Sequence, residues 1–284
     1  MGRTYDTVSF LTDYGLDDEF VGVVKSVLRD MAPHVTVVDL THNIRPFDVR
    51  GGSLALARAI PYVPEGVVLA VVDPGVGSAR RAVAVEVADG AGVMIGPDNG
   101  LLAPAVAVVG GAGRAVELTN PAWQLTGSGV TFAGRDIFAP AAAHLCNGVD
   151  LAELGPAIDP ALMLPGMVPL PREEPDGIHA EVLWVDRFGN CQLNVGPDDL
   201  AGDDVWTIVA GDDRRSARIV MTFSELGAGS LGLVRDSHGM LALAMDRRSA
   251  AGELGIDVGD AVRLTTDDSP PTTGGTPIRL GRRR

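Results

Sequence analysis

The hydrophobic and polar positions of the first 160 residues alternate between strand-like and helix-like patterns. Residues 8–11 and 35–40 are short apolar or β-branched runs, which indicate strands. Between them, apolar residues from Phe20 to Met31 recur with the spacing of one helix face, which predicts an amphipathic helix. Further strands are expected at 67–73, 83–87 and 93–95, and further helices at 52–60, 102–109 and 135–146. Strands that alternate with helices predict an α/β domain, a Rossmann-like layered sheet with helices.

The pattern changes after residue 160. Residues 164–177 contain four prolines and two glycines, which indicates a linker. Beyond this segment, apolar runs separated by glycine and aspartate predict short strands at 178–185, 192–195, 205–209, 217–223, 240–245 and 261–264. Short strands without intervening helices predict an all-β domain, a small antiparallel barrel or sandwich. We therefore expect an N-terminal α/β domain at 1–163, a linker at 164–177, a C-terminal β-barrel domain at 178–266 and a disordered tail at 267–284.

Composition narrows the class of protein. The 284 residues are 46% hydrophobic and 21% charged, which argues against a disordered chain. The net charge of −14 argues against a nucleic-acid binder, which needs a basic face, and mildly favours a positively charged ligand. Cys146 and Cys191 lack metal-ligand spacing and are expected to be buried thiols in a reducing compartment. No secretory signal or membrane-spanning stretch is apparent, so we expect a cytoplasmic protein with no membrane partner.

Common motifs for cofactors and metals do not fit this chain. The segment from Gly75 to Arg80 resembles the start of a dinucleotide-binding loop, but Arg80 replaces the third glycine. The five histidines are scattered, so no metal site is expected.

Polar residues instead follow the predicted strands. Asp13 lies between the first strand and a glycine turn, where a carboxylate can accept hydrogen bonds from a diol such as ribose. Asp17 and Asp18 precede the first helix, where their negative charges can simply stabilise the helix N-terminus through its dipole. Asp73 ends the apolar run 67–73, and Arg80 follows it across a glycine-rich loop. An Asp–Arg pair at this sheet edge would keep the carboxylate ionised, although a capping aspartate and a surface arginine are the alternative.

Two further groups are weaker signals. Gly134 is expected to open the helix at 135–146, where free N–H groups can hold an anion or a polarised water. Asp136 in its first turn fits a capped core helix equally well, and His144 among alanines is more typical of a packed residue. In the second domain, Asn190 with aromatic residues could form an apolar slot with the hydrogen bonds that an adenine requires, although each of these residues taken alone fits a turn equally well.

Together these segments resemble the S-adenosyl-L-methionine (SAM) hydroxide adenosyltransferases, or adenosine-forming SAM hydrolases, whose halide-using relatives are fluorinase and chlorinase. The resemblance covers about residues 6–265 and rests on the ordered motifs TD-x-G, P-x-DV, VVDPGVG-x-x-R, GPDNGLL, TF-x-GRDIFAPAAAHL, D-x-FGN and S-x-G-x-L. It implies an α/β domain followed by a β-barrel domain. It also implies a homotrimer in which SAM binds where the N-terminal domain of one subunit meets the C-terminal domain of its neighbour.

The resemblance also implies roles for individual residues. Asp13 would hold the ribose hydroxyls, Phe47 would pack against the ligand, and Asn190 and Phe223 would frame the adenine. The methionine part would be faced by Asp18, Asp186 and Ser237. Asp73 and Arg80 would belong to an Asp–Arg–His triad that orders the attacking water. SAM is then the substrate, and neither a cofactor nor a metal is implied.

The implied reaction is an in-line attack of water or hydroxide on C5′ of SAM, which releases L-methionine and adenosine. The acceleration of this reaction would come mainly from alignment and desolvation of the nucleophile. The halide-using relatives carry Tyr at the position of Asp73. An ionised carboxylate about 4 Å from a halide would repel it by about 4 kcal/mol at an effective dielectric constant of about 20. Asp73 therefore favours water over a halide.

One position departs from the family pattern. Ala133 stands where the hydrolases carry the histidine of the triad, between Phe132 and Gly134. We expect SAM binding to be retained and turnover to be reduced, since general acid–base help is typically worth ~10²–10⁴-fold. Two alternatives stay open: a chlorinase-like enzyme that forms 5′-halo-5′-deoxyadenosine, and a non-catalytic binder of SAM or adenosine.

Overall fold

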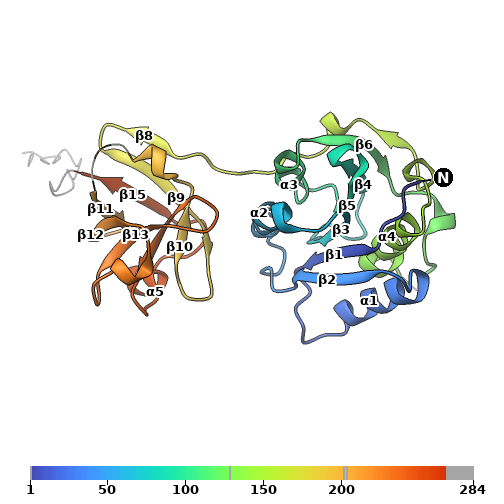
Figure 1. Cartoon of the computed structure of the whole chain (residues 1–284), viewed down its shortest axis with the longest axis horizontal. Coiled ribbons are helices and arrows are strands. Elements are labelled where there is room, and N and C mark those ends of the chain that lie inside the picture. The colour runs from blue at the N-terminus through green and yellow to red at the C-terminus, as the bar shows by residue number, and fades with distance from the viewer. Residues whose placement is uncertain (1, 128, 201, 203, 267–284) are drawn as a thin grey trace, which may run out of the picture. The chain divides into compact units, whose positions relative to one another are not determined.

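The structure is a computed structural model that describes residues 2–127, 129–200, 202 and 204–266. The predicted tail at 267–284 lies outside these residues. The chain divides into two compact units, residues 1–168 and 169–284, which are described separately (Figure 1). The division falls inside the segment 164–177.

The first unit is built on a seven-stranded sheet with the order β2-β1-β3-β5-β4-β6-β7. Its strands are β1 (Thr7–Thr12), β2 (Thr36–Thr41), β3 (Gly66–Val71), β4 (Ala82–Val87), β5 (Gly92–Pro97), β6 (Ala112–Glu117) and β7 (Ala157–Ile158). Its helices are α1 (Phe20–Met31), α2 (Val49–Ala59), α3 (Ala103–Val108) and α4 (Ala139–Cys146). Strands β2, β1, β3 and β5 pair in parallel, and β4, β6 and β7 extend the sheet by antiparallel pairing.

Strand β3 lies at the centre of this sheet and is buried on both faces, as its unbroken apolar run predicts. Its alternate residues enter two separate cores, because successive side chains of a strand point to opposite faces. Val67, Leu69 and Val71 join the core beneath α1 and α4. Val68, Ala70 and the following Val72 join the core beneath α2 and α3. The unit is therefore a three-layer α/β/α sandwich.

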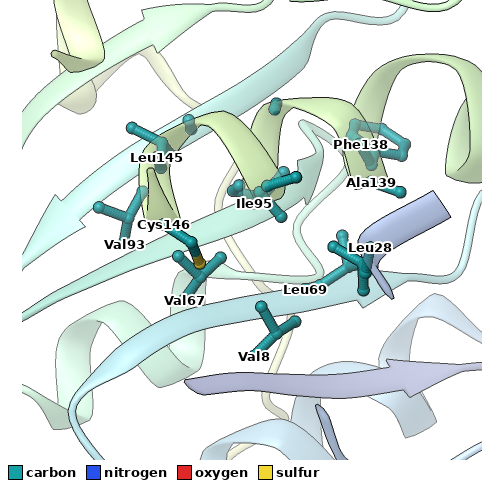
Figure 2. Packing of buried hydrophobic residues seen from close by; sticks show 14 of the residues in the cluster. Val8, Leu28, Val67, Leu69, Val93, Ile95, Phe138, Ala139, Leu145 and Cys146 are labelled. Carbon is teal, nitrogen blue, oxygen red and sulfur yellow. The ribbon is translucent and has the colours of Figure 1, made fainter. Parts of the chain in front are cut away.

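Helix α4 packs closely on the sheet because its surface is mostly alanine. Figure 2 shows the chain from Phe138 to Cys146 facing the apolar side chains of β3 and β5. Cys146 is buried and free there, and Cys191 is buried and free in the second unit, as expected. Burial raises the pKa of each thiol to about 12, so both stay protonated and unreactive.

The second unit is a closed barrel of seven strands with one additional strand. The strands are β8 (Arg172–Glu174), β9 (Gly177–Val185), β10 (Cys191–Leu193), β11 (Val205–Ala210), β12 (Asp213–Val220), β13 (Leu231–Arg235), β14 (Leu241–Met245) and β15 (Ala261–Thr265), with the short helix α5 (Ala250–Leu254). The order β10-β14-β13-β12-β11-β15-β9 closes through a β10–β9 pairing, and β8 adds to β9. The predicted β-barrel domain is confirmed.

Several details differ from the sequence-based expectation. The sequence patterns did not predict four strands and one helix. Glycine or charged residues interrupt the patterns of β6, β8 and β13. The other two elements, β7 and α5, are very short. The predicted linker is partly strand, since β8 pairs with β9 across a turn at Asp176. The barrel is not wholly antiparallel, because β12 and β13 pair in parallel. The helix expected at 135–146 begins with a π-helical turn, Gly134–Phe138, before α4.

No helix in the described part of the chain is long and apolar enough to span a bilayer.

A buried ion pair ties residues 162–164 to the sheet of the first unit. Arg81 donates through Nε and Nη2 to Asp98, at 2.9 and 2.6 Å, and the side chain of Asp98 is only 3% exposed. Arg81 also donates to the Leu162 carbonyl, and the Leu164 N–H donates to Asp98. Asp98 therefore joins the start of β4 and the end of β5 to residues 162–164.

Replacing Asp98 by alanine should lower the free energy of unfolding by roughly 1–3 kcal/mol, because the Leu164 N–H and the partly exposed Arg81 lose their hydrogen-bond partner. Urea denaturation followed by circular dichroism measures this change. Glu65→Ala is the matched control, because Glu65 pairs with Arg3 at the surface and its loss should cost less than about 1 kcal/mol. Equal effects of the two substitutions would contradict the structural role of Asp98.

Candidate active site

A pocket of about 390 Å³ opens in the first unit at the ends of β1 and β3. Five of the residues predicted from the sequence line it: Asp13, Asp18, Phe47, Asp73 and Ala133. They come from four separate segments of the chain, so the fold gathers them at one edge of the sheet. This is the edge where ligands bind in open α/β sheets.

The backbone beyond β1 supplies Asp13 and, through it, fixes Phe47. The carboxylate of Asp13 accepts a hydrogen bond of 2.9 Å from the N–H of Phe47. Phe47 has a φ of 69°, a conformation that a bulky residue rarely adopts. Its side chain is 72% exposed, and it lines the pocket. A strained and exposed aromatic residue held over a pocket is typical of a ligand contact.

Burial raises the pKa of Asp13, and the negative charge of Asp73 acts in the same direction. The hydrogen bond from Phe47 opposes this shift without cancelling it. Asp13 is thus a carboxylate whose ionised form has lost part of its hydration. It gains most from a ligand that donates hydrogen bonds.

Asp73 and Arg80 form the ion pair expected from the sequence. Arg80 Nε lies 2.9 Å and 3.0 Å from the two carboxylate oxygens of Asp73, and Arg80 Nη2 donates to Oδ2. The side chains are only 5% and 14% exposed, so the alternative of a capping aspartate with a surface arginine is wrong. The guanidinium also lies over the ring of Phe138, 5.3 Å from its centroid. Asp73 faces the pocket, while Arg80 holds it from behind.

A glycine in the loop after Asp73 and a hydrogen bond to the residue before it set the direction of Asp73. Gly77, with a φ of 78°, allows the tight loop that returns the chain from Asp73 to Arg80. The side-chain amide of Asn99, in the GPDNGLL motif, donates to the carbonyl of Val72 at 2.9 Å. Asn99 also accepts from the N–H of Leu101, which fixes its amide. The chain just before Asp73 is therefore anchored to the loop after β5.

Ala133 is buried at the pocket wall, immediately before the π-helical turn. Arg135 and Asp136 pair with each other at 2.7 and 2.8 Å, and neither lines the pocket. His144 packs on Trp123, 4.6 Å between ring centroids, and burial lowers the pKa of its imidazole. It is a packed residue, as expected. No histidine is found among the pocket-lining residues.

Aromatic residues that the sequence reasoning did not select form the remaining wall. Tyr14, Phe20 and Phe132 pack together, with ring centroids 5.2–6.0 Å apart. Phe20 was assigned to the core face of its helix, because a pocket wall and a core give the same periodicity. The signal that could have identified it is its position directly after three acidic residues, at the first turn of α1.

The second unit contains a separate pocket of about 460 Å³. Asn190 and Phe223 line it together with Phe188 and residues 245–249. Asp186 does not line it but accepts hydrogen bonds from the backbone N–H and the side-chain amide of Asn190, at 2.9 and 2.7 Å. Ser237 is exposed on the turn between β13 and β14 and does not line this pocket.

Among the described residues, one group has its possible metal-ligand atoms close together: Glu174, Asp176 and His179. The two acidic residues of this group are exposed, and Asp176 already pairs with Arg263. The pocket of the first unit instead offers carboxylates and aromatic faces, and the Arg80 guanidinium pairs with one of these carboxylates outside the pocket lining. These groups can hold a diol and a cation, and can orient a water molecule.

The fold and this arrangement define a class of enzymes that have an α/β domain, a β-barrel domain and a carboxylate-lined pocket. Family models for the N-terminal and C-terminal domains of SAM hydroxide adenosyltransferases match residues 8–155 and 180–263. The chain belongs to the SAM hydroxide adenosyltransferase family.

Individual relatives agree with this assignment. The chain is 48% identical to an (R)-S-adenosyl-L-methionine hydrolase of Salinispora tropica, over 91% of this chain and 97% of the relative. It is 42% identical to one of Thermus thermophilus, over 90% and 98%. A fluorinase of an Actinoplanes species is more distant, at 28% identity over 91% and 97%. The crystal structure of an uncharacterized conserved protein from Thermotoga maritima aligns with a TM-score of 0.82 at 32% identity, covering 91% of this chain and 99% of that chain.

The raised pKa of Asp13 predicts a pH-dependent stability cost. Because the folded state holds the proton more tightly than the unfolded state, ionised Asp13 destabilises the fold above its folded-state pKa. This cost declines as the pH falls through that pKa and vanishes below the ordinary Asp pKa of about 3.9. Asp13→Asn should therefore raise the melting temperature at about pH 7, and the gain should disappear in acid.

Melting curves between about pH 3 and pH 7 test this expectation. Asp17→Asn is the control, because Asp17 is exposed and its replacement should leave the pH profile unchanged. A lower melting temperature for Asp13→Asn at neutral pH would show that the ionised carboxylate stabilises the fold.

Proposed function

We propose that this protein hydrolyses S-adenosyl-L-methionine to adenosine and L-methionine. The observation that carries the proposal is the Asp73–Arg80 pair, held at the end of β3 with its carboxylate facing the pocket. Relatives that are 42–48% identical over nearly the whole chain are named SAM hydrolases, which supports the same reaction.

SAM binding in this proposal uses both units. Asp13 accepts hydrogen bonds from the ribose hydroxyls, and Phe47 covers the sugar. Asp18 faces the methionine part, to which Asp186 and Ser237 of the second unit also contribute. Asn190 and Phe223 frame the adenine. Three copies of the chain assemble as a homotrimer in the cytoplasm, so that the N-terminal unit of one subunit and the C-terminal unit of another complete each site.

The chemistry follows from the sulfonium of SAM, which is a neutral leaving group once displaced. A water molecule beside Asp73 attacks C5′ in line with the C5′–S bond. The new C5′–O bond forms, and the electron pair of the C5′–S bond passes to sulfur, which releases L-methionine. One proton of the water leaves by way of the Asp73 carboxylate to solvent. Arg80 holds this carboxylate in place, so the water is aligned before it reacts.

Asp73 also selects the nucleophile. A carboxylate accepts a hydrogen bond from water, whereas it repels a halide at the same distance. The aromatic residues Phe20 and Phe132 form an apolar wall of the same pocket, and a low local dielectric constant strengthens this electrostatic preference. Hydrolysis is therefore favoured over halide transfer.

Incubation of the purified protein with SAM, with and without chloride, tests the proposal. We expect adenosine and methionine in equal amounts by mass spectrometry, independent of chloride. A 5′-chloro-5′-deoxyadenosine product would assign a chlorinase-like activity instead. SAM recovered intact from a stable complex would assign a non-catalytic binder. Asp73→Asn is the matched variant and should lower the rate of adenosine formation by at least about ten-fold.

Restoring the histidine that the family pattern places at position 133 should raise the rate of adenosine formation. An imidazole on Ala133 would enter the pocket beside Asp73 and add a group able to hold or transfer a proton, typically worth ~10²–10⁴-fold. We expect Ala133→His to increase kcat at least about ten-fold. Ala133→Leu fills similar space without hydrogen bonds and should give no increase. An unchanged rate for Ala133→His would contradict the assigned position of the water.

A further inference from the structure

The hydroxyl of Tyr14 lies beside the position where the family histidine is missing. Tyr14 packs on Phe20 and Phe132, which directs its ring across the pocket wall. Its hydroxyl lies against the backbone of Gly134, the residue next to Ala133, so closely that a side-chain carbon built on Gly134 would overlap it. Tyr14, Ala133, Gly134 and Asp73 all line the same pocket. The absence of a side chain at Gly134 thus leaves the space that the phenol enters.

This hydroxyl makes no hydrogen bond to any other residue in the part of the chain that the structure describes. The backbone N–H of Tyr14 bonds to the Thr12 hydroxyl, so the turn after β1 is fixed while the phenol O–H is left for a ligand or water. Tyr14 lines the pocket, where its hydroxyl is available to a bound water or ligand, because polar groups in a binding pocket fix the orientation of what binds there.

The charges around the phenol keep it a hydrogen-bond donor. Burial raises the pKa of Tyr14 well above the ordinary value for tyrosine, and the negative charges of Asp13 and Asp73 raise it further. The positive charge of Arg80 opposes this without reversing it. The O–H therefore stays protonated at neutral pH, beside an Asp73 carboxylate that can only accept when ionised.

We infer that the Tyr14 hydroxyl donates a hydrogen bond to the attacking water and orients it in place of the missing histidine. This inference rests on the hydrolase reaction proposed above. The water then donates one O–H to the Asp73 carboxylate and accepts from Tyr14 on one lone pair. Its other lone pair is directed at C5′. No proton moves to or from Tyr14, and bond making and breaking are as given above.

Tyr14→Phe tests this inference, because it removes one oxygen atom and keeps the ring that packs on Phe20 and Phe132. We expect kcat for adenosine formation to fall about ten-fold or more, the order of effect for a lost hydrogen bond to the reacting water. The KM for SAM should change less than about two-fold, because the water and not SAM is the partner. The control is Tyr62→Phe, since Tyr62 is 79% exposed outside the pocket and its variant should keep the wild-type rate.

The double variant separates orientation from packing. In the Ala133→His background an imidazole can hold the water, so the added Tyr14→Phe substitution should cost less than about two-fold in kcat. A merely structural role of Tyr14 would give the same loss in both backgrounds. Melting temperatures of all variants identify any that fail to fold, and the rescue by histidine is itself evidence of an intact pocket.

The outcomes for the inference and for the proposed function are distinct. If the unaltered protein forms adenosine and Tyr14→Phe forms it at the same rate, the inference is wrong and the hydrolase assignment stands. An equal loss in both backgrounds would also overturn the inference. If the unaltered protein forms no adenosine from SAM, the proposed function fails, and the inference fails with it.

Discussion

The buried ion pair between Asp73 and Arg80 is the interaction on which the site depends. A carboxylate with a side chain only 5% exposed must have a compensating charge, because an unpaired buried charge costs several kcal/mol. Arg80 supplies it through two nitrogens, at the end of a strand that is itself buried on both faces. Asn99 fixes the chain before Asp73, and Phe138 lies under the guanidinium. The central strand, two loops and the π-helical turn thus all position one carboxylate.

The other carboxylate of the pocket has the opposite character. Within the described part of the chain, Asp13 accepts hydrogen bonds from backbone N–H groups and not from a cation, and one of these donors is Phe47, whose φ is strained. At neutral pH we therefore expect the folded protein to be less stable with Asp13 than with a neutral residue at this position. Such residues are typical of binding sites, where stability is given up for interactions that only a ligand completes. The pocket combines one rigid, paired carboxylate with one that is poised for a ligand.

The sequence predicted the central strands and the Asp–Arg pair because both depend on local patterns. The unbroken apolar run at 67–72 is short and rich in β-branched residues, which favours a buried strand, and a glycine-rich loop of six residues separates the following Asp73 from Arg80. Strand β13 was not recognised, because Gly232 and the polar residues around it hide a pattern that only pairing with two neighbouring strands stabilises. The wall formed by Tyr14, Phe20 and Phe132 was also missed. Contacts between segments more than 100 residues apart set this wall, and no local pattern distinguishes a pocket aromatic from a core aromatic.

The close approach of Tyr14 to Gly134 also has a consequence for the descent of the family. A side-chain carbon at position 134 would overlap the phenol oxygen unless the Tyr14 ring moved, so the residues at positions 14 and 134 constrain each other. A lineage that gains a side chain at position 134 must shift or shorten the side chain at position 14. Two residues separated by 120 positions in the chain are in this respect one inherited unit.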